Sequence, residues 1–293
     1  MAVLTAQGIS ALAIELLTRT LVLPMTVSRI SGAEFAGSNG DTITVRVPQP
    51  STARVQATPG ATITYDDVDE VPVNVTMTHL YHAKLVSDEE LSMSLEDFGR
   101  QITRVQVAAV ATEAEDLLGT AMNDLDADGT IDADGGNIEA IILEARETLG
   151  RNDVPADNRF LAVSPEVATF VLGLPNLSDV DKAGSSSALR DAVIGRYRGF
   201  TVVESNGLTA GRAVAYHRSG FAFANRVPVV PRGVVSSATA EAGGIGLRQI
   251  FQYVPDKLSD ATVVSTFSGA AAVPDDDSGL TFPRIFVMDT AAS

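Results

Sequence analysis

The chain has 293 residues, of which 45% are apolar, as expected for one large folded domain or two smaller ones. It contains no cysteine, which excludes disulfides, thiolate zinc sites and cysteine nucleophiles. Its 37 acidic residues outnumber its 21 lysines and arginines, and the net charge of −16 argues against a nucleic-acid-binding surface because no basic run offsets it. We recognise neither a secretory signal nor an apolar stretch long enough to span a membrane.

The first predicted element is an amphipathic helix at residues 5–23. Ile9, Leu12 and Leu16 recur at helical spacing, and Pro24 is expected to end the helix. Little neighbouring chain is available to bury this apolar face. We therefore expect the helix to dock elsewhere, on its own domain or on a neighbour.

Residues 42–86 are predicted to form a long β-hairpin that extends from a compact body. Apolar and polar residues alternate over 42–47 and again over 71–86, as in half-buried strands, and residues 61–65 also favour a strand. A hairpin of this length is a large projection. Projections of this kind usually lie on a partner.

A long helix, which we call the spine, is predicted from Ser94 to Asn123. Apolar residues recur in steps of four and three along it, and no proline interrupts it. It would be roughly 45 Å long at about 1.5 Å per residue. Two apolar rows run along the helix. We expect one row to pack on a sheet formed by residues 71–86 and 247–267, and the other to accept the N-terminal arm or a neighbour.

The remainder of the chain predicts a mixture of helices and strands. Ser164, Pro165 and Glu166 form a strong helix start, with a cap, a proline at the first position and an acid near the positive helix end. Helices are expected at 137–149, from this start to about 172, and at 188–194. Strands are expected at 159–163, 199–204, 213–216, 247–253, 261–267 and 282–288, with a small-residue loop at 236–244.

The sharpest chemical motif is the acidic stretch 124–136. Asp124, Asp126, Asp128 and Asp132 occupy positions one, three, five and nine of a calcium-type loop, and predicted helices flank it as in an EF-hand. Position twelve is Gly135, where a bidentate glutamate is expected. The motif is therefore interpreted either as a calcium site or as an acidic, solvated turn between two helices.

No catalytic or cofactor-binding constellation is predicted. His79 and His82 would point to opposite sides of a strand, which argues against shared metal ligation. Gly243, Gly244 and Gly246 precede a predicted strand rather than the helix that a phosphate-binding loop requires. We therefore expect a protein that is not an enzyme.

The order of elements resembles that of the major capsid proteins of tailed bacteriophages, which have the Hong Kong 97 fold. Five segments carry the likeness: GDTITVRVP at 40–48, the spine at 87–124, RFLAVSPEVATFVLGL at 159–174, ALRDAVIGRYRGFTVVESNGL at 188–208, and GLRQIFQYVPDKLSDATVVSTFSGAAAV at 246–273. The chain looks closest to the coat-protein branch of some short-tailed phages, although it has no clear counterpart of the domain inserted in that branch.

The resemblance implies an α+β fold with an N-terminal arm, an extended β-hairpin loop, a spine helix, and peripheral and axial domains. Mapped on this chain, the arm is 1–36, the hairpin and first peripheral strands are 37–86, and the spine with the acidic loop is 87–136. The axial domain is 137–225, and residues 226–293 return to the peripheral domain and form the C-terminal tail.

The resemblance also implies a function and partners. Copies of the chain are expected to self-assemble into pentamers and hexamers of an icosahedral shell around double-stranded DNA, without sequence-specific DNA binding and without a membrane. Scaffolding protein, portal and a decoration protein are the expected partners, and the virion capsid, assembled in the host cytoplasm, is the expected location.

Two alternatives stay open at this point. An encapsulin-like bacterial nanocompartment would keep the fold and change the contents of the shell. A secreted calcium-binding adhesion or carbohydrate-binding protein, built on the acidic loop, belongs to a different class.

Overall fold

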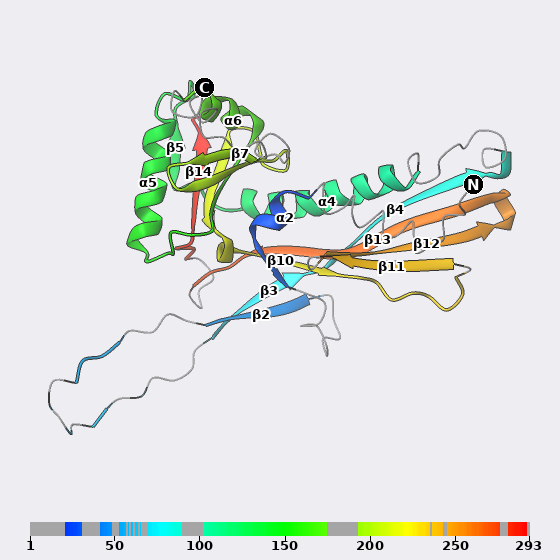
Figure 1. Ribbon diagram of the computed structural model, residues 1–293, viewed down its shortest axis with the longest axis horizontal. Coiled ribbons are helices and arrows are strands. Elements are labelled where there is room, and N and C mark those ends of the chain that lie inside the picture. The colour runs from blue at the N-terminus through cyan, green and yellow to red at the C-terminus, as the bar shows by residue number, and fades with distance from the viewer. Residues whose placement is uncertain are drawn as a thin grey trace.

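The computed structural model describes residues 21–30, 42–48, 53–56, 58, 60, 62–63, 65, 70–89, 102–174, 193–234, 236–242, 245–275 and 281–291. Within these residues the molecule is elongated: a long first sheet with a helix along it, a second sheet with two helices at one end, and a two-stranded ribbon that projects away (Figure 1). The α+β class expected from the sequence is therefore confirmed.

The first sheet has the strand order β1 (Ser28–Ile30), β10 (Phe221–Arg226), β13 (Ser259–Ala272), β12 (Ile245–Val254) and β11 (Ser236–Ala242), and β4 (Thr78–Ser87) also pairs with β13. Strand β13 pairs with three neighbours because it is 14 residues long. The prediction of a loop at 236–244 is wrong, since Ser236–Ala242 pairs antiparallel with β12. Small residues suggested a loop there, but pairing with a neighbouring strand decides the structure.

The projecting ribbon consists of β2 (Thr42–Pro48) and β3 (Glu70–Thr76), which pair antiparallel from Thr42 opposite Thr76 to Pro48 opposite Glu70. The predicted single strand over 71–86 is two strands, because β3 pairs with β2 whereas β4 pairs with β13. Thr62, Ile63 and Tyr65 are not in a strand, so the strand predicted at 61–65 is absent at these described positions. The base of the ribbon packs on the first sheet through a small apolar cluster of Val71, Val73, Val75, Ala222, Ala224 and Val273.

The spine is α4 (Arg104–Asn123), and the start predicted for it at Ser94 lies outside the described residues. Its buried side chains, which include Val107, Val110 and Leu118, form the main core with Leu80, Leu247 and Val264 of the first sheet and with Leu21 and Leu23 of the N-terminal segment. Both predicted contacts of the spine, with the sheet and with the arm, are therefore present.

The N-terminal segment contains a one-turn helix, α2 (Leu23–Thr26), followed by β1. Pro24 stands in the first turn of α2 instead of ending a helix, as it was expected to do. Proline suits this position because its missing N–H would have no partner there. The helix predicted at 5–23 falls outside the described residues up to residue 20.

The second sheet has the order β5 (Gly129–Ile131), β14 (Ile285–Thr290), β9 (Arg212–His217), β6 (Arg159–Val163), β8 (Phe200–Glu204) and β7 (Val193–Tyr197). Helices α5 (Ile138–Arg151) and α6 (Pro165–Leu172) pack on it through a second core that includes Ile142, Leu149, Val167 and Val171. Strand β6 and the start of α6 are as predicted, although the Ser164 side chain makes no capping hydrogen bond. The helix predicted at 188–194 is wrong at Val193 and Ile194, which belong to β7, and its other residues lie outside the described ones.

Two strands cross the boundaries expected between the domains. All but the last residue of strand β10 fall in the range 137–225, yet the strand pairs with β1 and β13 in the first sheet. Strand β14 falls in the range 226–293, yet it lies between β5 and β9 in the second sheet. The chain therefore passes between the two sheets more often than the sequence indicated. The short 3-10 turn Arg218–Gly220 lies at the passage from β9 to β10, whereas the turn Pro255–Lys257 joins β12 to β13 within the first sheet.

Candidate functional site: the acidic loop, the spine junction and the ribbon

The described residues contain no group of three or more acidic or histidine side chains placed to hold a metal ion. None of the helices described is both long enough and apolar enough to cross a bilayer.

The acidic loop is bound to the C-terminal strand. Residues Gly129–Ile131 form β5, parallel to Met288–Thr290 of β14. The backbone N–H of Asp128 donates to Val287 O at 2.8 Å, and the Val287 N–H donates to the Asp128 carboxylate at 2.9 Å. The structure does not gather Asp124, Asp126, Asp128 and Asp132 around one point. Calcium binding by this loop stays a prediction.

Calcium titration separates the two interpretations of the loop. If the loop is an acidic, solvated turn, millimolar calcium should produce no heat in calorimetry and no change in the melting temperature of the full chain. A saturable heat together with a raised melting temperature, both absent in the double variant Asp124→Asn, Asp126→Asn, would instead show a calcium site.

The C-terminal half of the spine is joined to the second sheet by close backbone contact. A Cβ atom placed on Gly119 would lie 2.3 Å from the carbonyl oxygen of Gly207, in the loop after β8. The Asn123 side chain makes two hydrogen bonds to the same loop. Its Nδ2 donates to Gly207 O at 3.0 Å, and its Oδ1 accepts from the Thr209 N–H at 3.0 Å. We call this contact between the spine and residues 205–209 the spine junction.

Arg212, on β9, binds the C-terminal end of the spine through hydrogen bonds. Its guanidinium donates to both carboxylate oxygens of Asp289, at 2.7 and 2.6 Å, and to the carbonyl oxygens of Met122 and Leu125, each at 3.2 Å, as well as to that of Asn123. The hydrogen bonds to Asp289 raise the pKa of Arg212. A cation at this position satisfies carbonyl groups that a helix C-terminus leaves unpaired.

Replacing Arg212 should destabilise the chain strongly. The Arg212 side chain is 12% exposed and the Asp289 side chain 38%, so removing the guanidinium takes a donor from the spine carbonyls, whereas water can replace part of the lost pairing of Asp289. We expect Arg212→Ala to lower the free energy of unfolding by about 2 kcal/mol. The matched control is Arg151→Ala, whose ion pair with Glu147 is 77% and 61% exposed and should be worth less than about 0.5 kcal/mol. Equal losses for the two variants in denaturant unfolding would contradict the role given to Arg212.

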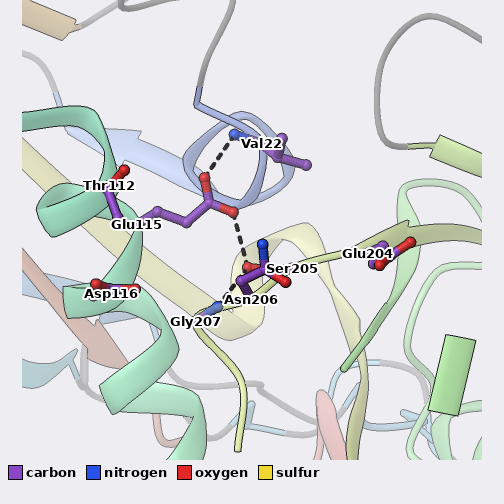
Figure 2. Close-up of a pocket in the computed structure, with 8 residues that line it drawn as sticks. All are labelled: Val22, Thr112, Glu115, Asp116, Glu204, Ser205, Asn206 and Gly207. Carbon is purple, nitrogen blue, oxygen red and sulfur yellow. Dashed lines mark hydrogen bonds between the residues drawn. The ribbon is translucent and has the colours of Figure 1, made fainter. Parts of the chain in front are cut away.

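A pocket of ≈ 360 Å³ opens beside the spine junction (Figure 2). It is lined by Val22, Thr112, Glu115, Asp116, Glu204, Ser205, Asn206 and Gly207. Glu115 of the spine reaches across it: Ser205 Oγ donates to its Oε1 at 2.8 Å, and the Val22 N–H donates to its Oε2 at 3.3 Å (Figure 2). Burial raises the pKa of Glu115, although the hydrogen bonds from Ser205, Val22 and Leu23 act in the opposite direction.

Sequence reasoning missed these residues. A glycine inside a predicted helix is a known sign of close packing, and Gly119 carried that signal. Glu115 follows Ala111 by four residues and precedes Leu118 by three, so it lies beside the apolar face of the helix. Nothing in the sequence indicated that Arg212 and Asp289, which are 77 positions apart, would pair.

The ribbon ends in exposed apolar side chains. Val55, Ile63 and Tyr65, between β2 and β3, are 92%, 55% and 84% exposed. The strands that carry this segment extend away from the first sheet and the spine (Figure 1). Apolar side chains on a projection gain stability when a partner covers them. Tyr81 and Leu85 on β4, which are 69% and 47% exposed, offer a second apolar surface on the body.

No family model matches the chain, and no curated protein does. Solved structures do match. A chain from Mycobacterium phage Che8 is 20% identical, with a TM-score of 0.61 over 92% of this chain and 90% of that chain. The capsid of Ralstonia phage GP4 matches with a TM-score of 0.62 at 10% identity, over 92% and 87%. A virus-like particle from Pyrococcus furiosus matches with a TM-score of 0.55 at 12% identity, over 96% and 97%.

The chain therefore shares its fold with the chain from phage Che8, with the capsid chain of phage GP4 and with the subunit of the virus-like particle. This is the fold that the resemblance in the sequence implies.

Proposed function

We propose that the protein is the major capsid protein of a tailed phage, with a structural and non-catalytic role. The observation that carries this proposal is the match to capsid structures over about nine-tenths of both chains. The exposed apolar side chains of the projecting ribbon support it, because a partner that covered them would bury apolar area.

The proposed mechanism is burial of each subunit's projections by its neighbours. The ribbon formed by β2 and β3 lies over the adjacent subunit, and the N-terminal arm, 1–36, docks on the spine or on a neighbour. Within the proposed axial domain, the loop at 177–187, which lies outside the described residues, meets its copies around the capsomer axis. Head-to-tail contacts of this kind close into pentamers and hexamers only when the rotation between subunits is right.

The remaining parts of the proposal concern contents and partners. The shell encloses double-stranded DNA without sequence-specific binding, in keeping with a chain of net charge −16 that repels the phosphate backbone. Scaffolding protein, portal and a decoration protein would act during assembly in the host cytoplasm, and the protein would end in the virion capsid.

Sedimentation of the expressed full chain tests the proposal. We expect a population of very large, homogeneous particles besides the 30.6-kDa subunit. A single species of subunit mass at every concentration and ionic strength would count against a shell protein.

A second candidate keeps the fold and changes the contents. The match to the Pyrococcus furiosus particle, over 96% of this chain and 97% of that chain, favours considering an encapsulin-like nanocompartment. Particles that hold a cargo enzyme, and a gene neighbourhood with that enzyme in place of portal and terminase, would favour this candidate. The adhesion alternative was based on the acidic loop, whose four aspartates are not gathered in the structure.

A further inference from the structure

One ionisable group lies where three parts of the molecule meet. Glu115 belongs to the spine, Val22 to the N-terminal segment, and Ser205 to the loop after β8 (Figure 2). The Ser205 hydroxyl also accepts from the Gly207 N–H at 3.2 Å, so the carboxylate is connected through it to the spine junction. Leu21, Leu23 and Val27 of the N-terminal segment are buried in the main core next to this site.

We propose that Glu115 is an acid-strengthened latch, which holds residues 21–27 on the spine more tightly in acid than at neutral pH. The proposal does not depend on the shell function. It requires that the N-terminal segment can lift from the spine, and that the water Glu115 then gains lowers its pKa by more than the loss of the Val22 hydrogen bond raises it.

The charges around Glu115 favour this behaviour. Asp116 on the spine and Glu204 at the end of β8 line the same pocket, and none of the residues that line it is basic. Residues 21–27 contain no ionisable side chain. On the β9 side, Tyr216 is fully buried and hydrogen-bonded to Thr26 at 2.5 Å, and its pKa is raised by burial, so it stays neutral. Arg218 reaches the segment only at its far end, through Val27 O.

The direction of the pH effect follows from linkage. Burial raises the pKa of Glu115 while the segment is docked. When the segment lifts, water reaches the carboxyl group, which lowers its pKa, and the hydrogen bond from Val22 is lost, which raises it. Burial has the largest effect on this pKa, so the pKa returns toward the ordinary glutamate value. The docked state therefore binds the proton more tightly. Protonation of Glu115 stabilises the docked state in full below the ordinary glutamate pKa. This stabilisation is lost as the pH rises through the raised pKa of the docked state.

Hydrogen exchange measured by mass spectrometry tests the latch on the full chain, held in one assembly state. The readout is the protection factor of peptides covering 21–30 at pH 5 and pH 8, corrected for the intrinsic exchange rate at each pH. We expect protection to fall severalfold from pH 5 to pH 8 in the unaltered chain. In Glu115→Gln, which cannot ionise, we expect the same protection at both values. Asp116→Asn, next to it in the pocket, should retain the fall.

A second variant keeps the proposal testable if Glu115→Gln does not fold. The hydrogen bond from Ser205 lowers the pKa of Glu115, so Ser205→Ala should move the midpoint of the change to higher pH. Protection that is equal at pH 5 and pH 8 in the unaltered chain, that rises with pH, or that still falls in Glu115→Gln would overturn the proposal. The proposal would also be overturned if the pH midpoint of the change in protection were the same in Ser205→Ala as in the unaltered chain.

Discussion

Gly119→Ala should open the spine junction and lower the free energy of unfolding by about 3 kcal/mol. The new methyl group would lie 2.3 Å from Gly207 O and 2.7 Å from Gly207 C, and both are backbone atoms that cannot rotate away. Alanine is otherwise the better helix residue by about 1 kcal/mol. A loss of stability at this position would therefore measure the contact between the spine and the loop and not helix propensity. Denaturant unfolding of the full chain gives the number.

Gly150→Ala is the matched control. Gly150 also lies inside a helix, α5, but nothing stands within 4 Å of the Cβ it would gain. We expect this variant to be unchanged or more stable by up to about 1 kcal/mol. Two alanine variants of equal stability would show that the spine and residues 205–209 can separate without cost, which contradicts the junction described above.

Deleting residues 48–62 should abolish shell formation while leaving a folded subunit. The deletion removes the projecting segment that contains Val55, which is 92% exposed, and spares both cores. An exposed segment contributes little to the stability of the single chain, so circular dichroism and the melting temperature should be close to those of the full chain. Light scattering should show no large particles, because the proposed contact between the ribbon and the neighbouring subunit is lost.

A double substitution tests the ribbon without shortening it. The double substitution Val55→Ser, Tyr65→Ser keeps the length of the segment and removes two exposed apolar side chains. We expect it to raise the protein concentration needed for assembly, because less apolar area is buried in each contact. Normal shells from the deletion variant would refute the role of the ribbon, whatever the double substitution does.

Elements whose structure is determined by their own local residue pattern were predicted best from the sequence. The strand 159–163 was predicted with its bounds because an apolar run ends at Ser164 and Pro165, which begin a helix. The spine was predicted because its apolar residues follow helical spacing over several turns. The fold was reached through the order of such elements, and the structural matches confirm it.

Where pairing between distant segments decides the structure, the sequence was less informative. Alternation continues through Met77, so nothing in the pattern shows that β3 and β4 join different sheets there. The small residues of β11 are a strand only because β12 lies beside them. Likewise, Glu115 and Arg212 gain their roles from Val22, Ser205 and Asp289, which lie far from them in the sequence.

Negative-stain electron microscopy of the expressed full chain tests the central claim most directly. The account predicts closed shells of uniform size, or rings of five and six subunits, built from this chain alone or together with a co-expressed scaffolding protein. Fields that contain only isolated subunits, with and without that partner, would contradict the assignment of this protein as a capsid subunit.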